Sequence, residues 1–198
     1  MTDVQNCFIP GGTLPVAKGD EIVPMVNAIA ARFENVILTQ DWHPRGHASF
    51  HTTHGKKAFD AHQLHYGEQV LWPEHAVQGT RDAEFHPDLD IPHAQLVIRK
   101  GYHKAVDSYS VFYEADRKTA TGLTGYLRHR GIDTVFLCGL ATDYCVAWSA
   151  VDARREGFDT YVIEDACRAI DLQGSLAKAW ADMHKAGVKR IQSSDLQH

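Results

Sequence analysis

Short runs of aliphatic and β-branched residues alternate along the chain with segments of helical spacing. The runs predict five strands, at residues 36–39, 96–98, 134–137, 160–163 and 188–191. The helical segments are residues 21–33, 122–130, 144–156 and 175–185, and the last three end at or near a glycine. Because parallel strands need crossover connections that cover the sheet, this alternation predicts an α/β fold. We expect a mostly parallel sheet with helices on both faces.

Residues 42–94 follow neither the strand period nor the helix period. Histidine, tryptophan, proline and glycine accumulate there, and ten of the 13 histidines lie between His43 and His103. A long stretch without regular structure inside a compact domain is usually functional. At 198 residues the chain has the length of one well-buried domain. We therefore expect a single domain over residues 1–198, with residues 42–94 as a long excursion that binds metal and substrate.

Composition argues against several classes of partner. The net charge is -5, and the 20 lysines and arginines are scattered, so we expect no nucleic-acid partner. No apolar run approaches the roughly 18 residues of a membrane span, and the first residues do not form a secretory signal. We expect a cytoplasmic protein without a membrane partner. The four cysteines form no CxxC pair, which argues against a disulfide framework or a zinc ribbon.

Several reactive side chains follow the predicted strands. Ligands of an open parallel sheet bind beyond the carboxyl ends of its strands. This rule selects Asp41, His43, Lys100 and Cys145, and also Asp3 if the opening residues are the tail of a first strand. We expect these side chains to meet at one edge of the sheet.

Cys145 has the position of a nucleophile. It lies at the predicted start of a helix, where backbone amides favour a thiolate and can hold an oxyanion. Beside it, Lys100 would lower the pKa of the thiol, and Asp3 could accept its proton and return one to a departing amine. The alternative is structural: a lone cysteine is often a small buried hydrophobe, and a lysine at a strand end is usually solvated. Cys138, inside an apolar strand, fits that alternative.

A second group of residues suits a metal ion. Asp41 and His43 stand two apart in Asp-Trp-His-Pro, and His75 ends a later Trp-Pro-Glu-His. Two ligands on one extended segment, completed by a distant histidine, would leave positions open for water or substrate. His47, His51 and His54 are competing ligands. A solvated, histidine-rich loop is the alternative.

These motifs together resemble the nicotinamidase/pyrazinamidase branch of the isochorismatase-like hydrolases. The resemblance rests on Asp3-Val4-Gln5-Asn6, Asp41-Trp42-His43-Pro44, Trp72-Pro73-Glu74-His75, Lys100-Gly101 and Gly139-Leu140-Ala141-Thr142-Asp143-Tyr144-Cys145. The segments Ala153-Arg154-Arg155 and Glu164-Asp165-Ala166-Cys167 extend it over nearly the whole chain.

The resemblance implies a function and a set of residue roles. The reaction would be hydrolysis of nicotinamide, and of pyrazinamide, to the acid and ammonia through a cysteine thioester, a step of NAD salvage. The implied catalytic triad is Asp3, Lys100 and Cys145. The implied ligands of one divalent ion (zinc first, iron or manganese otherwise) are Asp41, His43 and His75. A cis peptide between Leu140 and Ala141 would let the amides of Ala141 and Cys145 form an oxyanion hole, and Phe8, Trp72 and Tyr109 would line the substrate pocket.

Two features depart from the family pattern. Cys7 stands where the family usually has an acidic residue, and only Met1 and Thr2 precede Asp3, where an apolar strand is usual. Either that strand is missing from this sequence or its numbered start is not the natural one. A shortened central strand would hold Asp3 less firmly.

Other functions stay open at this point. A cysteine amidohydrolase of the same fold could act on a carbamoyl or ureido substrate, and a non-catalytic metal-binding scaffold is the alternative from another class. An isochorismatase fits less well, because its chemistry does not need the cysteine. A homo-oligomer is possible on this sequence, which does not fix the number of subunits or the metal.

Overall fold

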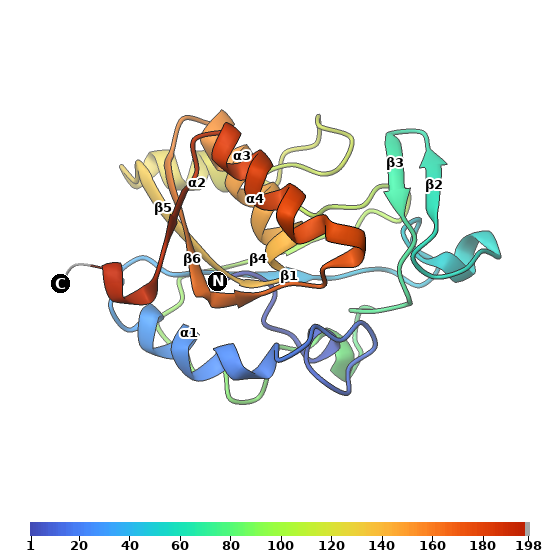
Figure 1. The fold of residues 1–198 in the computed structure, drawn as a ribbon, viewed down its shortest axis with the longest axis horizontal. Helices are drawn as coiled ribbons and strands as arrows, with labels where there is room; N and C mark the ends of the chain where they lie inside the picture. The colour runs from blue at the N-terminus through green and yellow to red at the C-terminus, as the bar shows by residue number, and fades with distance from the viewer. Residues whose placement is uncertain (197–198) are drawn as a thin grey trace.

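The computed structural model describes residues 1–196, and its main strands all run parallel (Figure 1). One pair consists of β1 (Ile37–Asp41) and β4 (Leu96–Lys100). A second group has the order β5 (Thr134–Leu140), β6 (Asp159–Arg168), β7 (Lys189–Ile191). All five strands predicted from the hydrophobic runs are present. Four of them extend two to five residues further at the carboxyl end, which brings Asp41 and Lys100 into β1 and β4.

Met1 and Thr2 connect the two groups of strands. Thr2 pairs with Gly139 of β5 in parallel register, and its N–H donates to the Cys138 carbonyl at 2.7 Å. On the other side, the N–H of Thr39 in β1 donates to the Met1 carbonyl at 3.0 Å. The opening residues thus occupy a central position between β1 and β5, and Asp3 follows directly at the carboxyl edge. A cavity of about 350 Å³, lined largely by apolar side chains, lies beside Met1 between these strands.

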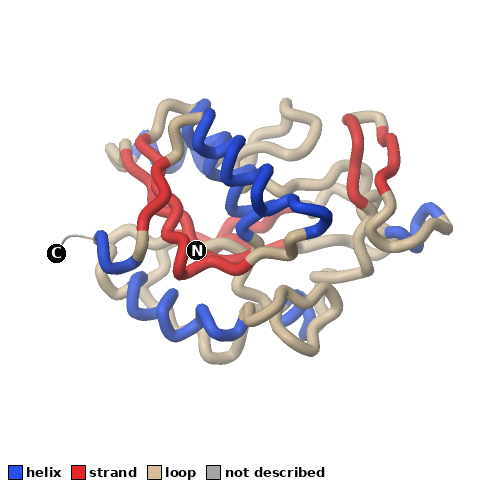
Figure 2. The backbone as a smooth tube through the Cα atoms, viewed as in Figure 1, coloured by secondary structure: helices blue, strands red, loops and turns tan. Residues whose placement is uncertain are grey.

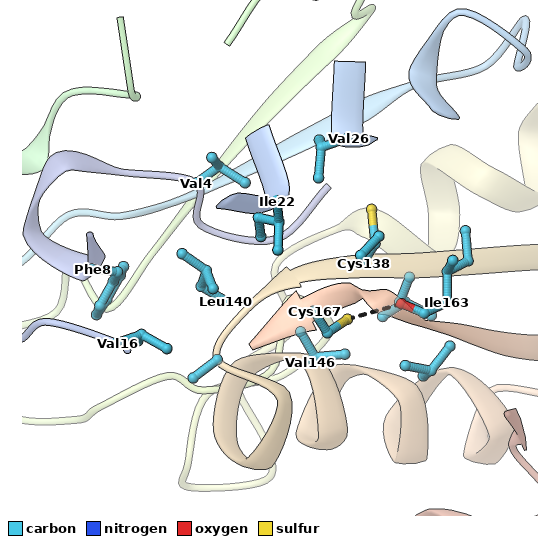
Figure 3. Packing of buried hydrophobic residues seen from close by; sticks show 14 of the residues in the cluster. Val4, Phe8, Val16, Ile22, Val26, Cys138, Leu140, Val146, Ile163 and Cys167 are labelled. Atoms are coloured by element: carbon cyan, nitrogen blue, oxygen red, sulfur yellow. Dashed lines mark hydrogen bonds between the residues drawn. The ribbon is translucent and has the colours of Figure 1, made fainter. Parts of the chain in front are cut away.

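Helices cover both sides of the strands, as predicted (Figures 1 and 2). The helix α1 (Val23–Ala30) lies on one side, and α2 (Leu123–His129), α3 (Ala147–Arg155) and α4 (Ser175–Lys185) lie on the other. Figure 3 shows the resulting core: Val26 of α1 approaches β5 and β6 from one side and Val146, just before α3, approaches from the other. Among residues 1–196, no helix is long and apolar enough to cross a bilayer.

Two predicted helices start differently in the structure. The segment expected at residues 21–33 begins as a 3-10 turn at Asp20–Ile22 and continues as α1 only to Ala30. The segment expected at residues 144–156 starts instead as a π-helical turn at Thr142–Val146, and α3 spans Ala147–Arg155. Cys145 therefore lies in this turn and not in the first turn of an α-helix.

Residues 42–94 contain a β-hairpin that the periodicity did not predict. Strands β2 (Ala61–Leu64) and β3 (Gly67–Val70) pair antiparallel, and the hairpin stands apart from the main strands (Figure 1). Neither strand is rich in β-branched or aromatic residues, so the usual strand signal is absent. Short 3-10 turns at His51–His54 and Arg81–Ala83 lie on either side of it in the sequence.

Candidate active site

Lys100 is the centre of the candidate site. Its side chain ends β4 and is 1% exposed, so its charge is almost completely removed from water. The Nζ atom lies 2.8 Å from Asp3 Oδ2 and 3.2 Å from Cys145 Sγ, and it also donates to Asp41 Oδ1. The structure thus brings the three residues of the implied triad together, with Asp41 as a fourth member. Two buried carboxylates compensate the buried ammonium, which is the condition for burying it at all.

Asp3 is held by β1 although only two residues precede it. The Thr39 hydroxyl donates to Asp3 Oδ1 at 2.5 Å, and the Asp3 N–H donates back to Thr39 Oγ1 at 3.1 Å. The other carboxylate oxygen, Oδ2, is buried and accepts no well-aligned hydrogen bond from the residues described. A carboxylate oxygen of Asp3 lies within 4.8 Å of Cys145 Sγ. Asp3 is therefore placed, and has a free lone pair, to exchange a proton with the thiol.

The turn before Cys145 contains the cis peptide bond implied by the resemblance, between Leu140 and Ala141. The Ala141 carbonyl accepts the N–H of Tyr144 at 3.2 Å and that of Val146 at 3.1 Å, which closes the turn around the cysteine. Among the described backbone groups, none accepts the N–H of Ala141 outside regular elements. This leaves the Ala141 amide free to donate to a negative oxygen beside Cys145 Sγ.

Lys100 acts on the pKa of the Cys145 thiol in the expected direction, but burial outweighs it and the net shift is upward. Burial raises the pKa of the Cys145 thiol well above its ordinary value of 9.0. Lys100 acts in the opposite direction, but the charges of Asp3 and Asp41 add to the effect of burial. Burial also raises the pKa of Asp3 above 3.8, against the effect of Lys100. The cysteine therefore rests as a thiol and needs a base when it attacks.

Asp41, His43 and His75 form the buried cluster expected for a metal ion, with one ligand atom of each within 4.8 Å of the others. The Nδ1–H of His43 donates to the Gly101 carbonyl at 2.9 Å, and that of His75 donates to the Pro73 carbonyl at 2.8 Å. These carbonyls fix both rings so that each Nε2 lone pair faces Asp41 Oδ2, at 3.7 and 3.9 Å.

Gly101 is required for this arrangement. Its φ is +65°, and a Cβ there would stand 2.4 Å from the His43 ring. Burial lowers the pKa of His75 to about 4, so this ring is neutral, as a metal ligand must be. A carboxylate and imidazole lone pairs that face one another in a buried site suit a divalent cation.

Of the three competing histidines, His47 forms a second candidate cluster with His43 and Asp107, whereas His51 and His54 are engaged elsewhere. The Nδ1 atom of His47 lies 2.7 Å from Ser49 Oγ, and its Nε2 atom lies near two backbone carbonyls, at 3.1 and 3.2 Å. His47 nevertheless stacks near His43, with ring centroids 4.3 Å apart. His51 and His54 belong to a 3-10 turn and bond to the carbonyls of Lys56 and Ala48. Neither joins a candidate metal cluster within residues 1–196.

Aromatic side chains line the cavity over Cys145. The three expected residues all lie there: Phe8, Trp72 and Tyr109. Trp72 packs edge-on against Tyr109 and against a further residue, Tyr144, with centroids 6.3 and 4.8 Å apart. The free volume is about 20 Å³, which is room for about one water molecule.

Sequence reasoning missed two buried polar residues, one that lines this cavity and one that contacts it. Asp107 lines the cavity, is 2% exposed and accepts the Ser108 N–H at 2.8 Å. Gln69, on β3, is equally buried and donates to Asp107 Oδ2 at 2.9 Å. The position of Asp107 shortly after the end of β4 was a usable signal, because the other site residues follow strands in the same way. For Gln69, inside an unpredicted hairpin, the sequence carried no comparable signal.

Comparison with known proteins identifies relatives over the whole chain. The isochorismatase domain matches residues 1–195. A nicotinamidase of Acinetobacter baylyi is 58% identical over 197 residues, which are 99% of this chain and 92% of that protein.

Two solved structures share the fold at lower identity. One from L. infantum, in complex with nicotinate, has a TM-score of 0.87 and 38% identity, and covers 100% of this chain and 92% of its own. A pyrazinamidase of Pyrococcus horikoshii, in complex with zinc, has a TM-score of 0.79 and 34% identity, covering 97% and 96%.

Proposed function

The chain belongs to the isochorismatase family, and we propose that it is a nicotinamidase, which hydrolyses nicotinamide and pyrazinamide to the acids and ammonia. One observation carries this proposal. The cluster of Asp3, Lys100 and Cys145 opens into the same small cavity as a buried carboxylate–imidazole cluster and three aromatic side chains. A nucleophile beside a cation site and flat apolar walls suits an aromatic amide with a basic ring atom.

We infer that the first half of the reaction forms a thioester. Cys145 Sγ attacks the amide carbon while its proton passes to Asp3, whose Oδ2 pairs with Lys100 at 2.8 Å and keeps a lone pair for the proton. The negative charge that develops on the carbonyl oxygen is held by the amides of Ala141 and Cys145. Lys100, 3.2 Å from Sγ, stabilises the sulfur as it loses its proton. The C–N bond then breaks, and ammonia leaves with the proton held by Asp3.

The second half returns the enzyme to its starting state. Asp3 takes a proton from a water molecule that attacks the thioester carbon, and the same amides hold the oxyanion. Breakage of the C–S bond releases the acid, and the proton returns from Asp3 to Cys145. The raised pKa of Asp3, caused by burial, suits this role, because the residue must accept and release a proton in each half-reaction.

Asp41, His43 and His75 would hold the divalent ion, and we propose zinc. The neutral His75 ring, the two Nε2 atoms that face Asp41 Oδ2 and the zinc complex of the Pyrococcus horikoshii relative support this choice. When bound, the ion supplies a Lewis acid for a basic ring atom of the substrate. Asp41 would then contact both charges, with Oδ1 on Lys100 and Oδ2 toward the ion.

A comparison of nicotinamide with benzamide tests the proposal. The two amides have the same shape, but benzamide lacks the ring nitrogen and so loses the orientation that places its amide carbon over Cys145. We expect ammonia release from nicotinamide, and a kcat/KM at least about 100-fold lower for benzamide. Comparable values would indicate a general amidase, and no release from nicotinamide would exclude the proposed activity.

A further inference from the structure

Gln69 occupies a buried position beside the cavity although none of the steps above uses it. Its Oε1 accepts the Tyr66 hydroxyl at 3.1 Å. The two N–H groups of its Nε2 are shared among three acceptors: the Val70 carbonyl at 2.8 Å, Asp107 Oδ2 at 2.9 Å and the Tyr109 hydroxyl at 2.8 Å. A carboxylate without a proton can only accept hydrogen bonds, so Asp107 fixes which end of the amide is the nitrogen. The nitrogen of Gln69, and not its oxygen, therefore lies against Tyr109.

The Tyr109 hydroxyl is surrounded by donors. Besides the bond from Gln69, it accepts the indole N–H of Trp72 at 2.9 Å. Neither nitrogen can accept a hydrogen bond, so both contacts use lone pairs of the hydroxyl oxygen. The hydroxyl proton must point away from both. No side chain or carbonyl among residues 1–196 accepts it.

This proton is also firmly bound. Burial, and then the negative charge of Asp107, hold the pKa of Tyr109 well above its ordinary value of 10.0. Tyr109 and Trp72 both line the cavity that contains Cys145. A buried donor without a partner is unfavourable, so a ligand in this cavity gains affinity if it offers an acceptor there.

The proposed mechanism leaves one kind of acceptor for this donor. The amide oxygen of the substrate would receive the N–H groups of Ala141 and Cys145, and one ring nitrogen would face the cation site. Nicotinamide then has no strong acceptor left. A diazine carboxamide such as pyrazinamide has a second ring nitrogen.

We propose that Tyr109 is a specificity-determining residue that donates a hydrogen bond to a second ring nitrogen of the substrate, and that Gln69 is the positioning residue that enforces this polarity. This inference rests on the proposed function. It assigns the site a preference for diazine over pyridine carboxamides that the aromatic walls alone would not provide.

The test compares kcat/KM for pyrazinamide and nicotinamide in the zinc-loaded enzyme and three variants. Tyr109→Phe removes the donor, and the ratio of pyrazinamide to nicotinamide should fall about 3- to 10-fold, the usual effect of one neutral hydrogen bond. Gln69→Leu removes a donor to the Tyr109 hydroxyl and lets that hydroxyl rotate, so the ratio of pyrazinamide to nicotinamide should also fall. Tyr66→Phe is the matched control, because it removes only the bond to the Gln69 oxygen. Its ratio should equal that of the wild type.

The ratio distinguishes a specificity role of Tyr109 from a structural one. General damage to the pocket would lower kcat/KM for pyrazinamide and for nicotinamide together and leave their ratio unchanged. An unchanged ratio in Tyr109→Phe would overturn the inference, and so would a ratio in Tyr66→Phe that falls as far as that of Tyr109→Phe. In either case, hydrolysis of nicotinamide by the wild type would still support the proposed function. Should Tyr109→Phe not fold, Gln69→Leu decides alone. If the wild type hydrolyses neither amide, the proposed function fails and this inference with it.

Discussion

Replacing Lys100 with methionine should destabilise the protein strongly as well as inactivate it. Methionine has a similar length and no charge, so it fills the space but removes the cation. The Nζ atom of Lys100 contacts Asp3 and Asp41 within a site where all three side chains are buried. The change leaves two carboxylates close together, without their counter-charge and out of reach of water.

Removal of one partner from a buried ion pair costs about 3 to 5 kcal/mol of the free energy of unfolding. Native proteins have only about 5 to 15 kcal/mol in total. The free energy of unfolding of a protein this size falls by about 2 to 3 kcal/mol per molar urea, so the unfolding midpoint should fall by about 1 to 2.5 M. The surface pair of Lys178 and Asp182 provides the control, because exposed pairs contribute at most about 1 kcal/mol.

The assay is urea unfolding of wild type, Lys100→Met and Lys178→Met at pH 7, with a chelator present so that ion binding does not contribute. The pH dependence has a defined sign. Lys100 holds the pKa of Asp41 well below 3.8, so this stabilisation is present at neutral pH and is lost in acid. Without Lys100 the pKa rises, the carboxylates take up protons, and the gap between variant and wild type narrows as the pH falls from 7 toward 4. A Lys100→Met midpoint as close to wild type as that of Lys178→Met would refute this reasoning.

Three further outcomes follow from the site. Asp3→Asn should lower kcat by about 10²- to 10⁴-fold, since no base remains for the thiol, while native circular dichroism is retained; near-normal turnover would exclude Asp3 as the base. His75→Ala should lose the divalent ion that elemental analysis finds in the wild type, and equal occupancy would place the ligands elsewhere. Burial lowers the pKa values of His75 and His47 from 6.5 to about 4. Between these pH values, and without bound metal, both histidines are protonated in the unfolded chain but neutral in the native protein. Its urea midpoint should fall between pH 6.5 and 4, and a constant midpoint would contradict the assignment of neutral rings.

The fold could be predicted where one strong local signal was enough. The helix α4 spans Ser175–Lys185 as expected, because its spacing is regular and Gly187 follows shortly after it. The hairpin Ala61–Val70 was missed, because its strands contain few β-branched residues. Each strand is stabilised by pairing with the other, which the local sequence of either one does not reveal. The central position of Met1 and Thr2 also depends on two partner strands that are distant in sequence.

The membership of the site could be predicted better than its electrostatics. Strand ends selected Asp41, Lys100 and Cys145, and the structure places them around one ammonium group. The pKa of the thiol could not be predicted, because it depends on burial and on two carboxylates from distant parts of the chain, Asp3 and Asp41. The role of Gln69 is likewise visible only once Asp107 fixes the orientation of its amide.

Ammonia release from nicotinamide by wild type and Cys145→Ala, prepared in parallel with zinc, tests the central claim most directly. Alanine removes the sulfur and little volume, so the variant should keep the circular dichroism and the zinc content of the wild type. We expect rapid release by the wild type and none above background by the variant. Release by Cys145→Ala at a rate near that of the wild type would contradict thioester catalysis at this site.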